Sequence, residues 1–145
     1  MNYAAVRARY LDDTVRTASP ATLLTMLYDR LVLDLQRAED LQRAGDRPGA
    51  GRQLVHAQDI VSELSGTLDT DAWDGGQQLM SVYSFLLTEL VGANMSGDPE
   101  RTAGCRRVVE PLRDAWHDAA ASLTPTVPAQ RGAYSAAAGG VLGVG

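Results

Sequence analysis

The residues that could carry chemistry are few and scattered along the chain. Asp114 precedes His117 by three positions, which would place both side chains on one side of a helical turn. A di-iron site in a helical bundle needs Glu-x-x-His on two helices and a Glu on two others. No Glu-x-x-His occurs in this sequence. We therefore expect Asp114 and His117 to form a solvated or locally hydrogen-bonded pair, with no metal.

A catalytic nucleophile is not expected either. The single cysteine, Cys105, falls on an apolar helical face and has no histidine near it in sequence, whereas a nucleophile needs an adjacent base and an orienting group. We expect Cys105 to pack in a core and His56 to lie at the edge of one. The glycine pairs at 75–76 and 139–140 match no phosphate-binding loop. The sequence thus predicts no enzyme, no cofactor and no small-molecule substrate.

The composition of the chain narrows the classes of function that remain. The 145 residues suit one domain, with 45% hydrophobic and 21% charged residues and a net charge of −5. Nucleic-acid binding is not expected, because phosphate neutralisation needs a basic face. The single cysteine suits a reducing compartment. The N-terminus lacks the apolar segment of a signal peptide and no apolar run could span a bilayer, so we expect a cytoplasmic protein without membrane insertion.

The hydrophobic spacing indicates four helical segments and no strand. They run from Pro20 to about Ala44, from Gln53 to Leu68, from Gly76 to Asn94, and from Pro99 to Leu123 after an Asp98 cap. Short loops between helices of this length make neighbours antiparallel. The predicted fold is all-α, an antiparallel up-down four-helix bundle.

The ends of the chain differ from this bundle. Residues 1–18 form an N-terminal arm in which Tyr3, Val6, Tyr10 and Val15 are spaced for a short amphipathic helix. Residues 124–145 are rich in Ala, Gly and Pro, a composition that predicts a disordered tail. The predicted domains are therefore an arm, 1–18, a bundle, 19–123, and a tail, 124–145.

The first helical segment is more apolar than bundle packing requires. A helix that packs on one side needs an apolar stripe a little over 100° wide, and the five apolar residues within 23–28 exceed it. Part of this surface could be a groove for another chain, or the arm could cover it and the residues would then be core. For Leu24, Leu27 and Leu31 a core role is favoured. For Met26 and Tyr28 both readings stay open, with the groove favoured.

An ordered series of short motifs resembles the FliS family, the flagellin-specific export chaperones of the bacterial flagellar secretion system. The resemblance covers about residues 3–123. Its motifs are the tyrosines of the arm, VRTASP (15–20), MLYD (26–29), AQDIVSELSGTLD (57–69), GG (75–76), YSFLL (83–87), AN (93–94) and LRDAW (112–116).

The resemblance implies a bundle that binds the C-terminal segment of flagellin in an apolar surface groove. It also implies that binding prevents premature polymerisation in the cytosol, and that the loaded chaperone is delivered to the flagellar export gate. The groove and arm residues expected to bind flagellin are Tyr3, Val6, Tyr10, Val15, Leu23, Met26 and Tyr28. Many relatives have acidic residues after the Ser-Pro, where this chain has Ala21 and Thr22, so the first turn is expected to be less firmly capped.

Three other readings fit parts of the sequence. An apolar groove is not very selective, so a helical-bundle chaperone for another export client is the first alternative. A homo-oligomeric structural bundle without a client is the second, and a carboxylate-bridged metal enzyme is the third.

Overall fold

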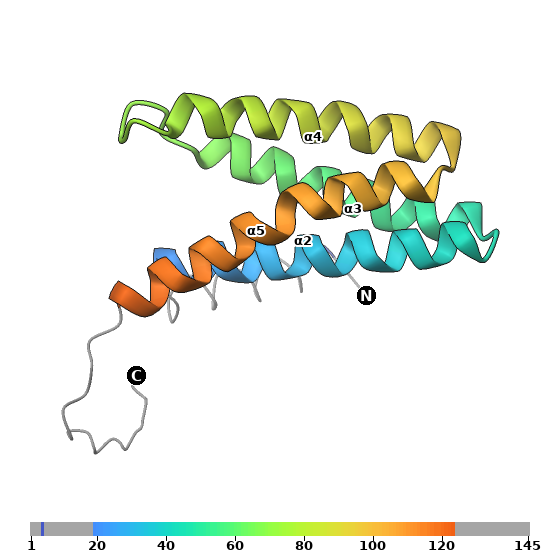
Figure 1. The fold of residues 1–145 in the computed structure, drawn as a ribbon, viewed down its shortest axis with the longest axis horizontal. Coiled ribbons are helices and arrows are strands. Elements are labelled where there is room, and N and C mark those ends of the chain that lie inside the picture. The colour runs from blue at the N-terminus through green and yellow to red at the C-terminus, as the bar shows by residue number, and fades with distance from the viewer. Residues whose placement is uncertain (1–3, 5–18, 124–145) are drawn as a thin grey trace, which may run out of the picture. The chain divides into compact units, whose positions relative to one another are not determined.

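The computed structural model describes residue 4 and residues 19–123. This part of the chain contains no strand, and residues 19–123 form four helices (Figure 1): α2 (Pro20–Arg43), α3 (Arg47–Thr67), α4 (Gly76–Ser96) and α5 (Pro99–Leu123). The predicted all-α class is confirmed. The predictions for the arm and the tail fall on residues outside the described part, apart from Ala4.

The chain divides into two compact units. Residues 26–113 form one, and residues 1–25 with 114–145 form the other, of which residues 4, 19–25 and 114–123 are described. Helices α2 and α5 each contribute to both units.

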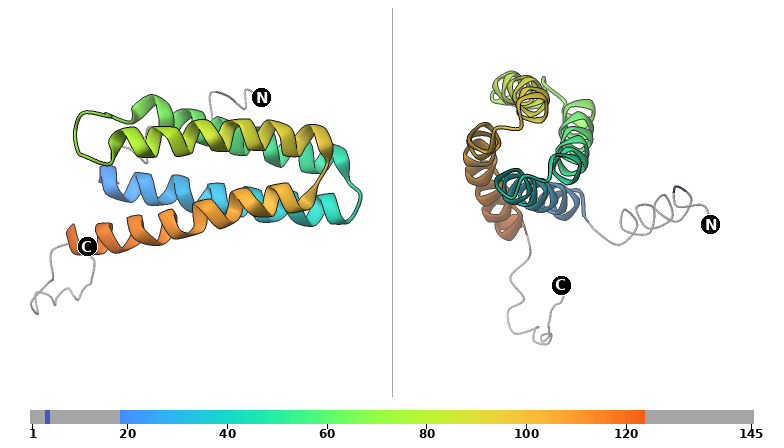
Figure 2. Two further views of the ribbon diagram at one scale, coloured as in Figure 1. Left: turned by 45° about the horizontal axis from the view of Figure 1, so that its top comes forward. Right: turned by 90° about the vertical axis from the view of Figure 1, so that its right-hand side faces the viewer.

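Unit 26–113 is an antiparallel bundle in which consecutive helices run in opposite directions (Figure 2). Hydrogen bonds join neighbouring helices around the bundle: Asp34 on α2 to His56 on α3, Arg47 on α3 to the last carbonyls of α4, Glu89 on α4 to Arg101 on α5. Burying the apolar face of each helix stabilises the unit, by about 25 cal/mol per Å² of apolar surface. The largest fully buried side chains are Tyr28, Leu31, Leu35, Leu54, Val61, Leu64, Leu86, Leu90 and Val109, with Tyr83 at 2%.

The helix starts follow the chemistry of their caps. The Ser19 hydroxyl accepts from the Thr22 backbone N–H at 3.1 Å, as a Ser N-cap should. The Thr22 hydroxyl lies 2.9 Å from the Ser19 hydroxyl. Thr22 occupies the position where a capping box has an acidic residue. Its side chain thus contacts the cap residue but does not form a capping box.

The predicted start of the second helix is wrong by six residues. The glycines and proline of 45–51 predict a loop, but α3 begins at Arg47 because Asp46 is its N-cap and accepts from the Gly49 N–H at 2.9 Å. Pro48 is harmless in the first turn, where its missing N–H has no helical partner. A Cβ on Gly49 would lie 2.5 Å from the Asp46 carboxylate, so this glycine makes room for the cap.

Glycines stand just after the ends of two helices. Gly45 and Gly97 have φ of 82° and 70°, the left-handed region that glycine adopts without a steric penalty, and they follow α2 and α4. The Gly97 N–H donates to the Ala93 carbonyl at 2.9 Å, which satisfies one free acceptor at the end of α4.

The apolar residues from Cys105 to Leu123 are spaced three and four apart, which predicts one continuous buried face on the fourth helix, but only the first half of this face is buried. Cys105 and Val109 are buried, whereas Leu112 and Trp116 are half-buried and Leu123 is 73% exposed. A continuous heptad spacing therefore overstated the burial of this helix. The helix also continues through Pro111, which cannot donate a backbone hydrogen bond to Arg107.

Candidate functional site

Two large apolar side chains are exposed on the outer face of α2 within unit 26–113. Met26 is 38% exposed and Leu33 is 37% exposed. They are seven residues apart and therefore share one side of the helix. Leu33 was missed in the sequence, although its spacing from Met26 is a signal that could have identified it. We call Met26 and Leu33 the α2 apolar pair.

Tyr28 lies in the core of the same unit. Its hydroxyl is 2.6 Å from the hydroxyl of Tyr83 on α4, and both side chains are buried. Burial and the bond to Tyr28 raise the pKa of Tyr83 well above its usual value, so this phenol stays protonated. The structure thus places Tyr28 in the core of the unit and not on its surface.

The other predicted binding residues lie elsewhere. Leu23 is half-buried in the first turns of α2, within the smaller unit. Tyr3, Val6, Tyr10 and Val15 are outside the described residues. Leu31 is fully buried, as expected, whereas Leu24 and Leu27 are half-buried. The structure therefore describes three of the seven predicted residues, of which Leu23 is half-buried, Met26 is exposed and Tyr28 is buried.

A buried carboxylate lies on the α2 side that faces α3. Asp34 has no exposed surface and accepts from Arg30, four residues earlier, at 2.9 Å. Its second oxygen contacts Nδ1 of His56, which is half-buried on α3. A buried charge is tolerated only when it is paired and hydrogen-bonded. His56 is thus at the edge of the core, as the sequence predicts, and it joins α3 to α2.

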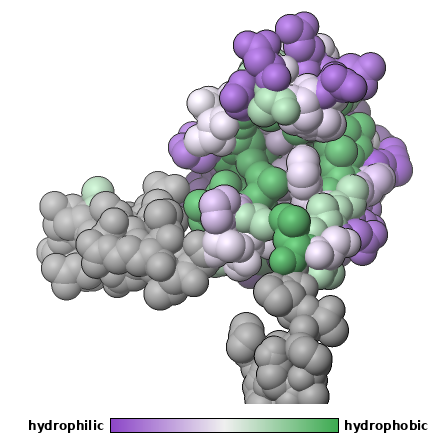
Figure 3. Space-filling model, turned by 90° about the vertical axis from the view of Figure 1, so that its left-hand side faces the viewer, coloured by the Kyte–Doolittle hydropathy of each residue, from purple (hydrophilic) through white to green (hydrophobic). Residues whose placement is uncertain are grey.

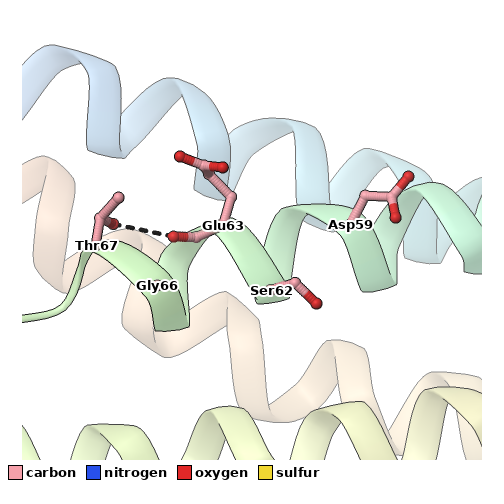
Figure 4. Close-up of a pocket in the computed structure, with 5 residues that line it drawn as sticks. All are labelled: Asp59, Ser62, Glu63, Gly66 and Thr67. Carbon is pink, nitrogen blue, oxygen red and sulfur yellow. Dashed lines mark hydrogen bonds between the residues drawn. The ribbon is translucent and has the colours of Figure 1, made fainter.

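The outer side of α3 carries a shallow polar hollow (Figure 4). Its lining comes from the motif 57–69 that carries the family resemblance: Asp59, Ser62, Glu63, Gly66 and Thr67. The Thr67 hydroxyl donates to the Glu63 carbonyl at 3.0 Å. Four apolar residues of the same motif, Ala57, Ile60, Val61 and Leu64, are buried, so the motif has a core side and a polar outer side.

The described residues hold no constellation for catalysis. Burial, with a smaller contribution from Glu89, raises the pKa of the Cys105 thiol to about 11, so it stays protonated and poorly nucleophilic at neutral pH. Within the described range, no three His, Cys, Asp or Glu side chains are placed to hold a metal ion. None of the four helices is long and apolar enough to cross a membrane.

The loop between α3 and α4 is strongly hydrophilic. Figure 3 shows hydrophilic side chains gathered at the top of one face, over this loop and the start of α4. Local hydrogen bonds order the loop: the Asp69 carboxylate accepts from the Asp71 N–H, and the Trp73 carbonyl accepts from the Gly76 N–H. A Cβ on Gly76 would lie 2.6 Å from the Thr70 carbonyl oxygen, so the second glycine of the GG motif allows close backbone packing.

Comparison with known proteins places this bundle in a family. The family described as flagellar protein FliS matches residues 2–123. The flagellar secretion chaperone FliS of Bacillus subtilis is 29% identical over 110 residues, which are 76% of this chain and 82% of that protein. The protein of the same name from Escherichia coli is 28% identical over 110 residues, 74% of this chain and 81% of that protein. Since the family match spans all of the described residues, the chain belongs to the FliS family.

Proposed function

We propose that this chain is a flagellin-specific export chaperone of the flagellar type III secretion system. It binds the C-terminal segment of flagellin in the cytoplasm, prevents premature polymerisation and delivers the subunit to the export gate. The family match over residues 2–123 carries the proposal, together with the names of the curated relatives as flagellar secretion chaperones.

The geometry of unit 26–113 supports a binding role. A bundle core buries the inner face of each helix, so exposed large apolar residues on an outer face are available to a partner. The α2 apolar pair provides two anchors one heptad apart, the spacing at which an amphipathic helix of a client would place its own apolar residues.

Tyr28 has an indirect role in this proposal. Its ring and hydroxyl are held in the core by Tyr83, so it fixes the position of α2 beneath the α2 apolar pair. In the proposal, Leu23 and the arm residues Tyr3, Val6, Tyr10 and Val15 contribute further client contacts.

Isothermal titration with the C-terminal peptide of the organism's own flagellin tests this function. We expect about one peptide per chain and a gain of helix in circular dichroism, because the segment folds as it binds. Peptides from hook-associated proteins serve as controls. Tighter binding of one of those peptides would assign the chain to another client, and no binding of any peptide would refute the proposal.

The α2 apolar pair has its own variant test. Met26→Ser and Leu33→Ser should each weaken flagellin binding several-fold, because each removes apolar area from the interface. The matched control is Val55→Ser on the outer face of α3, where the side chain is 49% exposed. Equal loss in all three variants would mean that α2 has no special part in binding.

A further inference from the structure

Two exposed arginines of unit 26–113 carry charges that the unit does not neutralise. The side chains of Arg37 on α2 and Arg52 on α3 have no ion pair or hydrogen bond among the described residues. Asp40 lies three residues after Arg37 but makes no ion pair with it. Most other arginines of residues 19–123 are bonded to carboxylates or carbonyls: Arg30, Arg43, Arg47, Arg101 and Arg106. We call Arg37 and Arg52 the arginine pair.

The register of α2 and α3 places the arginine pair at one level of the bundle. The two helices are antiparallel neighbours (Figure 2), and the Asp34–His56 contact fixes which residues lie side by side. Arg37 lies three residues after Asp34, and Arg52 lies four residues before His56. At about 1.5 Å per residue, these offsets are about 4.5 and about 6 Å in the same direction, because the helices run oppositely.

The arginine pair also borders the line where α2 meets α3. Residues three or four apart lie on the same side of a helix, so each arginine shares a side with one member of the Asp34–His56 contact. Asp34 cannot serve as their counter-charge, because it has no exposed surface and is already bonded to Arg30 and His56. Two like charges thus face solvent on either side of this line, and an anion between them would reduce their repulsion.

The arginine pair is continuous with the α2 apolar pair. Arg37 lies four residues after Leu33 and eleven after Met26, so the three side chains follow one side of α2. The distance along the helix axis from Leu33 to Arg37 is about 6 Å. A client segment that covers Met26 and Leu33 therefore reaches the arginine pair about one helical turn further on.

The end of the proposed client has the chemistry that this pair can bind. The last residue of a polypeptide carries an α-carboxylate, which is ionised at neutral pH. A guanidinium can hold a carboxylate through two parallel N–H···O bonds. If the bound segment is helical, its dipole adds partial negative charge at the same end. Both features favour the C-terminal end of a client at the arginine pair over its N-terminal end.

We infer that Arg37 and Arg52 bind the α-carboxylate of the flagellin C-terminal segment, and thereby set the direction in which that segment lies on α2. Its apolar side chains cover Met26 and Leu33 before its chain end reaches the arginine pair, so it runs there in the same direction as α2. The inference rests on the proposed function, which makes a C-terminal segment the client. It adds recognition of a chain end to the apolar contacts, and so selects a C-terminal segment over an internal one.

Isothermal titration with the flagellin peptide as a free acid and as a C-terminal amide tests the inference, because the two forms differ only in the carboxylate. With the wild type, amidation should weaken binding by roughly five-fold, the size of an exposed ion pair. In Arg37→Gln and in Arg52→Gln, the ratio of the two affinities should fall towards one. Arg107→Gln is the matched control, since Arg107 is exposed on α5 without a partner among the described residues, and it should keep the wild-type ratio.

Equal affinity of the acid and the amide for the wild type would overturn the inference and leave the proposed function standing. If Arg37→Gln and Arg52→Gln weaken both forms alike, the arginines bind an acidic side chain of the client, and the inference is wrong. A wild-type ratio in both variants would place the carboxylate elsewhere. Failure of both peptide forms to bind the wild type would refute the proposed function itself. Circular dichroism melting shows whether each variant is folded.

A spin label supplies a readout of direction that does not depend on affinity. A nitroxide on a cysteine near the C-terminal end of the peptide should broaden the NMR amide signals around Arg37 and Arg52 more than those around Met26. A label about three helical turns earlier in the peptide should instead broaden the signals around Met26. The reverse pattern would contradict the inferred direction.

Discussion

At the residue scale, the Tyr28–Tyr83 pair shows how one polar contact sets the register of two helices. The two phenols come from sequence positions 55 residues apart and meet at 2.6 Å inside the core. A buried hydroxyl that loses its partner retains the cost of losing water, typically about 1–3 kcal/mol.

Tyr28→Phe should therefore destabilise the chain by about 1–3 kcal/mol in urea unfolding, because it leaves the Tyr83 hydroxyl buried without this partner. The double variant Tyr28→Phe/Tyr83→Phe should recover part of that loss, since both polar atoms are then gone. Additive losses in the double variant would show that the two hydroxyls do not act as a pair.

Two glycines within helices have no steric reason to be glycine. A Cβ on Gly66 in α3, or on Gly104 in α5, would meet no atom within 4 Å. Gly66→Ala and Gly104→Ala should each raise the free energy of unfolding, by up to about 1 kcal/mol in a helix interior. Thermal melting measures this gain.

At the element scale, an ion-pair network joins α2 to α5. Glu39 accepts from Arg106 at 3.0 Å and from Arg43 at 3.2 Å, and Arg43 also reaches Glu100. Burial alone would raise the pKa of Glu39. The hydrogen bonds and positive charges of Arg106 and Arg43 outweigh that effect, so the pKa of Glu39 lies below its usual value.

The lowered pKa of Glu39 gives stability a defined pH dependence. A carboxyl whose pKa is lower when folded contributes its full stabilisation above the unfolded pKa, about 4.5 for Glu, and loses it as pH falls through the folded value. Glu39→Gln should therefore destabilise at pH 7 and converge with the wild type in acid. Urea unfolding at several pH values measures the difference. Glu63→Gln, in an exposed residue outside the ion pairs of the described range, should show no such convergence.

Helix boundaries show what the sequence could and could not predict. The starts at Pro20, Gly76 and Pro99 were predictable, because capping and proline rules act locally. The start of α3 was missed because Gly49 looks like a loop residue but in fact makes room for the Asp46 cap. Burial along α5 was overstated, since periodicity shows which residues share a face but not whether a partner covers that face.

The same limit applies to the candidate binding residues. An excess of apolar residues over 23–28 predicted exposed apolar surface on α2, and Met26 is indeed exposed. Whether Met26 or Tyr28 faces outward depends on which neighbour lies beside α2, and the partner of Tyr28 is 55 residues away. Sequence spacing alone contains no information about that partner.

At the scale of the whole molecule, the chain combines a bundle with terminal segments of different composition. The tail from Thr124 to Gly145 is poor in large apolar residues, so we predict that it adds little to the stability of the fold. Deleting it should leave the melting temperature nearly unchanged. A clear fall in calorimetric melting temperature would show that the tail contributes to the folded state.

The two tryptophans give each unit its own optical reporter. Trp73 belongs to unit 26–113, where its ring lies against Gly75 and is 49% exposed, and Trp116 belongs to the other unit. Trp116→Phe leaves an indole that emits from the first unit alone, and Trp73→Phe leaves one in the second. Since α2 and α5 run without interruption through both units, we expect the two emission curves to share one urea midpoint. Separate midpoints would show that the ends of these helices unfold as a foldon of their own, which the fluorescence emission of a single tryptophan reports.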